Sequence, residues 1–191
     1  MKNKRWVVYP KVEGGLREQL LTNRKIDNKV DQESFLHPHL TKLVSSEKLF
    51  PQIERVLGRI KKAISEKELI YIYGDYDVDG ITASAILWET LDLLGAKVLP
   101  YIPSRHTEGY GLNNEALESL AKEGAKVVIS VDCGITAVEQ AKFAKKLGLD
   151  LIITDHHQPQ KILPESFAIL HTTTLSGAGV AFKLAAALLE E

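Results

Sequence analysis

Cysteine is almost absent from this chain of 191 residues, because Cys133 is the single one. One cysteine excludes an internal disulfide and a zinc site built from several thiolates, so any metal must be held by oxygen and imidazole ligands. No apolar run reaches the roughly 20 residues that span a bilayer, and none has the form of a signal-peptide core. We therefore expect a cytoplasmic protein without membrane attachment.

An excess of charge of either sign is also missing, since the formal net charge is −1. Such a charge provides no overall attraction for a polyanion, so nucleic-acid binding would need local basic groups. Residues 59–62 and 145–146 are basic runs, but a solvated helix face is the commoner origin of such runs. The chain also has no Gly/Ser-rich linker, low-complexity tract or internal repeat. One main globular domain with an extension is therefore expected.

Short apolar runs alternate with helical patterns from about Leu69 onward. Helical periodicity is clear in residues 81–94 and 135–147 and in a last segment from about Gly177. Runs that are apolar on both faces and joined by helices predict an open α/β fold, a doubly wound, mainly parallel sheet with helices on both faces. The expected strands are residues 69–74, 97–102, 125–131, 149–154 and, more weakly, 166–170.

The pattern before Leu69 is different. It contains one short strand candidate at Arg5 to Tyr9, a polar helical stretch near residues 15–24, and a helix from about Pro51 to Glu66. We interpret residues 1–68 as an N-terminal extension packed on the sheet, and residues 69–191 as the main domain.

Aspartates follow three of the predicted strands. A single Asp after a strand is as often a turn former or a helix N-cap as a ligand. Ligands of doubly wound sheets, however, bind beyond the carboxyl ends of the strands, where these residues are expected to meet. They are Asp75, Asp77 and Asp79 after the first strand, Asp132 after the third, and Asp155, His156 and His157 after the fourth.

A cluster of this kind needs a cation. Two carboxylates about 4 Å apart at an effective dielectric near 20 repel by roughly 4 kcal/mol. No Lys or Arg lies inside the three motifs, so a divalent metal is indicated, and carboxylates joined by imidazole suit Mn²⁺ or Mg²⁺, with Mn²⁺ favoured. We interpret Cys133 as a small residue that fills the crowded turn between the third predicted strand and the following helix. Two metals bridged by one carboxylate would support phosphoester hydrolysis.

These residues also carry a family likeness. Residues 74–80 read Gly-Asp-Tyr-Asp-Val-Asp-Gly and resemble the first motif of DHH-superfamily phosphoesterases in its RecJ form, and residues 155–157 are the triplet that names the superfamily. Residues 103–112 resemble a RecJ segment with an Arg before Gly-Tyr-Gly-Leu, and residues 176–182 resemble the family's glycine-rich helix start. The chain is thus similar to the N-terminal catalytic part of RecJ-type single-stranded-DNA-specific exonucleases.

The resemblance implies a role for each matching residue. Asp77 would bind one metal ion, Asp79 and His156 a second, and Asp132 would bridge the two. His157 would face the scissile phosphate. Asp132, His156 and His157 are thereby the predicted catalytic residues.

Five further positions take supporting roles by the same resemblance. Asp75 and Asp155 would orient the ligands. Arg105 would bind a substrate phosphate, because its planar guanidinium suits phosphate oxygens, although a surface Arg is the alternative. Gly177 and Gly179 would open a helix whose N–H groups bind phosphate, although close helix packing explains two glycines equally well.

Two departures from the family pattern affect these expectations. The usual histidine four residues before the Asp77 position is Tyr73 here, which would weaken the first metal site. The family also has a further aspartate ligand beyond the glycine-rich helix and a second domain that grips the substrate, whereas this sequence stops at Glu191. We therefore expect a chain truncated at its C-terminus, which folds, binds one Mn²⁺ more often than two and degrades DNA poorly.

The resemblance implies a 5′–3′ exonuclease with two Mn²⁺ or Mg²⁺ ions, which works in DNA repair and recombination beside a helicase and a single-strand-binding protein. Alternatives within the superfamily are an oligonucleotide phosphodiesterase or pyrophosphatase, whose first motif usually reads differently. A phosphoacceptor receiver domain would need a Lys after a late strand, where His171 stands. A catalytically inactive binding module with this fold is the remaining alternative.

Overall fold

The computed structural model describes residues 5–39 and 43–190 of the chain. The chain forms two compact units, Met1–Val44 and Ser45–Glu191. None of the helices in the described ranges is both long and apolar enough to cross a membrane.

The smaller unit contains two short helices, α1 (Leu16–Asn23) and α2 (Lys29–Leu36). The first confirms the predicted helical stretch, whereas α2 was not predicted, although Asn28 caps it by accepting a hydrogen bond from the N–H of Asp31. The strand predicted at Arg5 to Tyr9 is wrong, because these residues form no strand and Trp6 is 94% exposed. An apolar run of this length becomes a strand only where another strand pairs with it.

The larger unit is a five-stranded sheet in the order β2-β1-β3-β4-β5, with every neighbouring pair parallel. This confirms the predicted doubly wound fold. The five strands lie where the sequence places them, with shifts of one or two residues at their ends. The elements are α3 (Ser46–Leu49), α4 (Ile53–Ser65), β1 (Leu69–Tyr73), α5 (Val78–Leu93), β2 (Lys97–Tyr101), α6 (Asn114–Lys122), β3 (Ala125–Val131), α7 (Val138–Lys146), β4 (Asp150–Asp155), β5 (Ala168–His171) and α8 (Gly177–Leu189).

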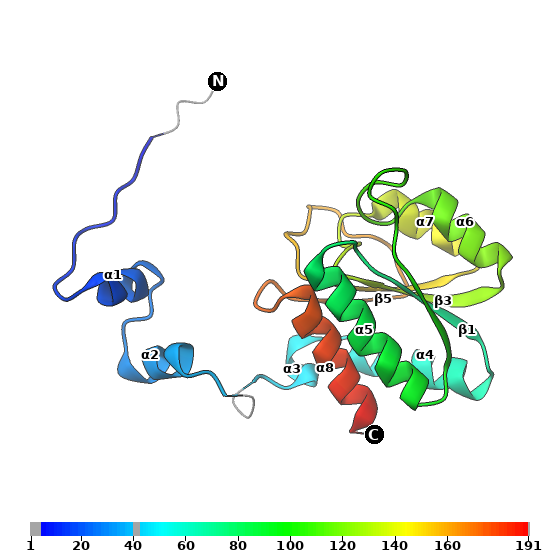
Figure 1. Ribbon diagram of the computed structural model, residues 1–191, viewed down its shortest axis with the longest axis horizontal. Coiled ribbons are helices and arrows are strands. Elements are labelled where there is room, and N and C mark those ends of the chain that lie inside the picture. The colour runs from blue at the N-terminus through cyan, green and yellow to red at the C-terminus, as the bar shows by residue number, and fades with distance from the viewer. Residues whose placement is uncertain (1–4, 40–42, 191) are drawn as a thin grey trace. The chain divides into compact units, whose positions relative to one another are not determined.

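Helices cover both faces of the sheet (Figure 1). On one face α4, α5 and α8 bury side chains such as Leu87 and Leu184 against Ile72 and Ile129 of the central strands. On the other face α6 and α7 bury Leu117 and others against the opposite sides of the same strands. Because the strands are buried on both faces, they read as continuous apolar runs in the sequence.

Helix α4 belongs to the same compact unit as the sheet. Its Arg59 is bound on both sides, by Glu68 and Asp150, each at 2.6 Å, with only 9% of its side chain exposed. The basic run at residues 59–62 is therefore partly structural rather than a free patch for nucleic acid. The proposed domain limits of residues 1–68 and 69–191 stay a prediction.

Candidate metal centre

The acidic residues meet where the chain changes direction across the sheet. In the sheet, β2 lies on one side of β1 and β3 on the other. The chain therefore leaves the carboxyl end of β1 toward β2 and the carboxyl end of β3 toward β4, in opposite directions across the sheet. Such a switch point is where doubly wound sheets bind ligands. Asp75 follows β1 and Asp132 follows β3, and both side chains are buried.

The loop after β1 is tightly closed by the first turn of α5. A Cβ at Gly80 would lie 2.7 Å from the backbone N and O of Asp75, so only glycine allows this approach. Asp77 is the N-cap of α5 and accepts a 2.9 Å hydrogen bond from the N–H of Gly80. Burial raises the pKa of the Asp75 carboxyl, and the charge of Asp77 adds to the shift. Asp77 is thus a cap and also part of the acidic cluster.

Asp79 links α5 to the start of α8. Its two carboxylate oxygens accept hydrogen bonds of 2.7 Å from the N–H groups of Gly177 and Ala178. Burial raises the pKa of Asp79, but these bonds outweigh that effect and the pKa lies below its ordinary value. The carboxylate therefore stays ionised and stabilises the N-terminus of α8.

Asp132 is the most constrained acid of the site. Its backbone has φ of 60°, which is rare for a residue with a side chain. Its side-chain oxygen Oδ1 is buried and accepts no hydrogen bond from the described residues. Burial, followed by the charges of Asp79 and Asp77, raises the pKa of Asp132 to about 7. A buried carboxyl with an unused oxygen among other acids is in a position that favours a bound cation.

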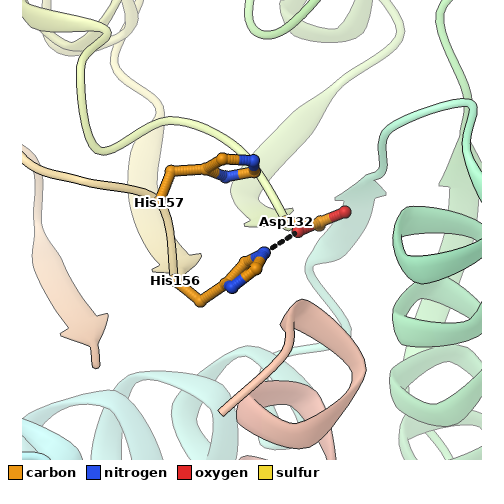
Figure 2. A group of neighbouring side chains, drawn as sticks. All are labelled: Asp132, His156 and His157. Atoms are coloured by element: carbon orange, nitrogen blue, oxygen red, sulfur yellow. Dashed lines mark ion pairs between the residues drawn. The ribbon is translucent and has the colours of Figure 1, made fainter. Parts of the chain in front are cut away.

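Two imidazoles extend toward Asp132 from the end of β4 (Figure 2). Nε2 of His156 lies 3.1 Å from Oδ1 of Asp132 and 3.6 Å from Oδ2 of Asp79. The first distance suits an ion pair when the imidazole is protonated, although the contact lacks the geometry of a hydrogen bond. The ring centroids of His156 and His157 are 4.6 Å apart.

The carboxylate of Asp155 positions both histidines. Its Oδ1 accepts from the backbone N–H groups of His156 at 2.7 Å and His157 at 3.1 Å, and its Oδ2 accepts from Ile135 at 2.9 Å. Nδ1 of His157 lies 2.8 Å from the same Oδ1, so the carboxylate favours a proton on that nitrogen. Burial lowers the pKa of His157, but Asp155 raises it more, and the net shift is upward.

Two groups of ligand atoms share Asp132. One contains Asp132, His156 and His157, and the other contains Asp75, Asp77 and Asp132, with the atoms of each group within 4.8 Å of one another. Oxygen and imidazole donors of this kind suit a hard or borderline divalent cation. Asp132 is therefore positioned between two possible cation sites. Asp79, the other predicted ligand of the second metal, is in neither group, and the assignment of individual ligands stays a prediction.

The remaining predicted residues border this centre. The guanidinium carbon of Arg105 lies 5.4 Å from the ring centroid of Tyr76, so the exposed Arg stands beside the acidic loop. The N–H of Gly177 is directed to Asp79, and the N–H of Gly179 to the hydroxyl of Ser176 at 3.2 Å. Phosphate binding by Arg105 and by the two glycines stays a prediction.

Two tyrosines complete the surroundings. Tyr73, at the position of the family histidine, is fully buried; its hydroxyl donates to the carbonyl of Gly111 and accepts from the amide of Asn113, both at 3.0 Å. Sequence reasoning missed Tyr110, whose hydroxyl lies 3.4 Å from Nε2 of His157 and 3.4 Å from the carbonyl of Asp132. The Gly-Tyr-Gly-Leu run indicates a functional loop, but it does not predict the contact between Tyr110 and His157.

Known proteins resemble this chain in sequence and in fold. The single-stranded-DNA-specific exonuclease RecJ of Bacillus subtilis (strain 168) is 46% identical over 183 residues, which cover 90% of this chain and 23% of the relative. A crystal structure of exonuclease RecJ bound to manganese is 37% identical with a TM-score of 0.68, covering 74% of this chain and 38% of the other. RecJ of Thermus thermophilus in complex with Mn²⁺ is 31% identical with the same TM-score, covering 91% of this chain and 25% of the other.

The chain thus spans about a quarter of the length of the B. subtilis relative. The model of the DHH family, N-terminal domain, matches residues 69–191, which include all of the acidic cluster. This chain therefore belongs to the DHH family.

Proposed function

We propose that this chain supplies the metal-binding domain of a nuclease that removes nucleotides from single-stranded DNA by hydrolysis of phosphodiester bonds. The observation that carries the proposal is the sharing of Asp132 by two groups of metal-ligand atoms at the switch point of the sheet. The likeness to RecJ proteins, which are named single-stranded-DNA-specific exonucleases, supports the substrate. We further propose that the attack is at the 5′ end of the strand, as the resemblance of the sequence motifs implies.

The cation we assign is Mn²⁺, with Mg²⁺ as a substitute. Related structures of RecJ hold Mn²⁺, and another holds Mg²⁺. In this chain Asp77 would bind one ion, Asp79 and His156 the other, and Asp132 both. Two divalent ions lower the pKa of a water molecule and hold the phosphate for in-line attack.

The remaining residues would position the substrate and the ligands. Asp155 holds His157 through Nδ1 and favours the protonated imidazole, which would donate a hydrogen bond from Nε2 to the phosphate. Asp75 lies close enough to the atoms of Asp77 and Asp132 to orient them. Arg105 stands at the rim of the acidic loop, where a guanidinium would hold a phosphate of the incoming strand. The N-terminus of α8 would assist it only if a phosphate replaced Asp79 at the N–H of Gly177 and Ser176 at the N–H of Gly179.

We further propose that the activity serves DNA repair and recombination in the cytoplasm. An exonuclease that is specific for single-stranded DNA needs single strands, which a helicase produces and a single-strand-binding protein covers. These two proteins are therefore the partners we expect.

The first test measures Mn²⁺ binding by isothermal titration calorimetry. We expect at least one Mn²⁺ to bind each chain, and we expect Asp132→Asn to abolish that binding. Asp92→Asn is the matched control, because Asp92 is an exposed acid near the far end of α5. A wild-type chain that binds no Mn²⁺ would overturn the proposal in favour of an inactive module.

The second test follows hydrolysis of single strands labelled at the 5′ or the 3′ end. We expect slow, Mn²⁺-dependent release of nucleotides from the 5′ end, which Asp132→Asn removes and Asp92→Asn retains. Pyrophosphate and dinucleotides are assayed in parallel. Faster turnover of either than of the long single strand would assign the site to the other enzymes of the superfamily.

A further inference from the structure

A cavity of about 340 Å³ opens beside the metal centre, on the side of α7. It shares His157 with one of the two groups of ligand atoms, and it is also lined by Asp155, which contacts Nδ1 of that histidine. Its other walls come from the loop before α6, with Tyr110 and Gly111, and from the segment that leads into α7, with Ile135. A volume of this size is at the lower end of the range for small-ligand sites.

The walls of this cavity are uncharged apart from Asp155 and His157. Leu112 and Ile135 provide apolar surface, and Tyr110 adds a half-exposed aromatic ring. None of the described residues that line it is Lys or Arg. Away from His157, a phosphate would therefore find no cationic partner there, whereas a flat, uncharged group would find a suitable surface.

Two polar side chains in the cavity are free to recognise such a group. The amide of Gln140 and the hydroxyl of Thr136 line the cavity, and neither is hydrogen-bonded to any side chain or backbone group in the part of the chain that the structure describes. Each can act as both donor and acceptor. Together they could pair with the edge of any of the four bases, because an amide can rotate to present either its oxygen or its nitrogen.

We propose that this cavity binds the nucleobase of the terminal nucleotide, with Tyr110 stacking on the base and with Gln140 and Thr136 at its edge. The inference rests on the proposed function, since the scissile phosphate at the metal centre defines which base reaches the cavity. Stacking on an aromatic ring tolerates every base, which suits an enzyme that removes nucleotides regardless of sequence. The contact of Tyr110 with His157 would then align the base with the phosphate.

The test compares two product-like ligands by calorimetry in the presence of Mn²⁺. The first is deoxyadenosine 5′-monophosphate, and the second is 2-deoxyribose 5-phosphate, which has the same phosphate and no base. Stacking contributes about 1–3 kcal/mol per base. We therefore expect the nucleotide to bind roughly tenfold to a hundredfold more tightly than the sugar phosphate.

Variants assign this preference to the cavity. Tyr110→Ala should reduce the preference for the nucleotide toward unity and leave the affinity for the sugar phosphate unchanged. Tyr110→Phe keeps the ring and should keep most of the preference. Gln140→Ala, at a half-buried position of α7, should reduce the preference without a change in Mn²⁺ affinity and serves as a second variant if Tyr110→Ala unfolds.

The outcomes separate the two proposals. Equal affinity for the two ligands in the wild-type chain would overturn the base cavity and leave the metal-dependent nuclease intact. A Tyr110→Ala variant that weakens both ligands equally would also overturn it, since Tyr110 would then act on the phosphate alone. Binding of neither ligand with Mn²⁺ present would overturn the cavity together with the proposed function.

Discussion

Gly177 packs so closely on Asp132 that a Cβ at its position would lie 2.4 Å from Oδ1 of the carboxylate. Cβ atoms do not approach oxygen so closely, so Gly177→Ala must displace either α8 or the carboxylate. Overpacking of this kind costs about 1–3 kcal/mol. We expect Gly177→Ala to lower the melting temperature of the metal-free chain and to weaken Mn²⁺ binding by roughly tenfold, as measured by calorimetry.

The control is the same substitution where space is available. A Cβ at Gly58, in α4, meets nothing within 4 Å, so Gly58→Ala should leave Mn²⁺ binding unchanged. It should also stabilise the helix by about 0.5–1 kcal/mol. Wild-type Mn²⁺ affinity in Gly177→Ala would show that the close approach to Asp132 has no part in forming the site.

Asp132 should make the stability of the metal-free chain depend on pH. Its pKa is raised to about 7 from an ordinary value of 3.8, so the folded state binds the proton more tightly than the unfolded state. Protonated Asp132 therefore contributes to the free energy of unfolding at low pH, and this contribution is lost as pH rises through about 7. At 1.36 kcal/mol per pKa unit, Asp132→Asn should gain up to roughly 4 kcal/mol relative to wild type above that pH.

Urea unfolding of both proteins at pH 4.5 and pH 8, without metal, measures this difference. The difference between variant and wild type removes the contributions of the other carboxyls, such as Asp79, whose lowered pKa acts in the opposite direction. Mn²⁺ affinity of the wild type should also rise with pH through about 7, since the metal displaces the proton. An equal stability difference at the two pH values would contradict a raised pKa at Asp132.

Asp77 allows the charge of the cluster to be separated from helix capping. Asn is as good an N-cap as Asp, so Asp77→Asn keeps the hydrogen bond from Gly80 and removes one negative charge. We expect it to raise the melting temperature of the metal-free chain and to reduce the stabilisation that Mn²⁺ provides. Asp77→Ala loses the cap as well, and should be about 1 kcal/mol less stable than Asp77→Asn.

Differential scanning fluorimetry with and without Mn²⁺ gives both quantities. The informative comparison is between the two substitutions, because they share the loss of charge and differ in the cap. A lower melting temperature of metal-free Asp77→Asn than of wild type would argue against repulsion within the cluster.

The sheet was predictable because each strand has a recognisable pattern in its own sequence. Buried parallel strands such as β3 are continuous apolar runs, and the acids stand at their carboxyl ends, where chemistry is expected. The start of α5 was predicted at Ile81, whereas the helix begins three residues earlier, at Val78. The helix begins instead at the cap that Asp77 provides.

Contacts between distant residues were not predictable from local patterns. Asp79 binds the N–H of Gly177, 98 positions later, and this pairing depends on how α5 packs against α8. Tyr110 reaches His157 only because its loop folds over the end of β3. The run at Arg5 to Tyr9 has strand-forming residues, but strand formation depends on a partner that a sequence pattern does not specify.

Arg105 should act on the substrate and not on the metal. Its loop is organised by Glu108, which accepts from the N–H of Ser104 at 2.7 Å and from the hydroxyl of Tyr101, and Arg105 itself lies over Tyr76. Arg105→Ala should weaken binding of single-stranded DNA at low salt, because one phosphate contact is lost. Mn²⁺ affinity should stay close to that of wild type.

Fluorescence anisotropy with a labelled single strand over a series of salt concentrations tests this prediction. Loss of one phosphate contact should flatten the slope of log affinity against log salt by about one unit at most. Arg105→Lys keeps the charge and loses the planar fork, so it should keep the slope and lose part of the affinity. Lys146→Ala, at the end of α7, is the control for the removal of any surface charge. If Arg105→Ala and Lys146→Ala weaken binding equally, Arg105 is an ordinary surface residue and the phosphate must be held by other groups.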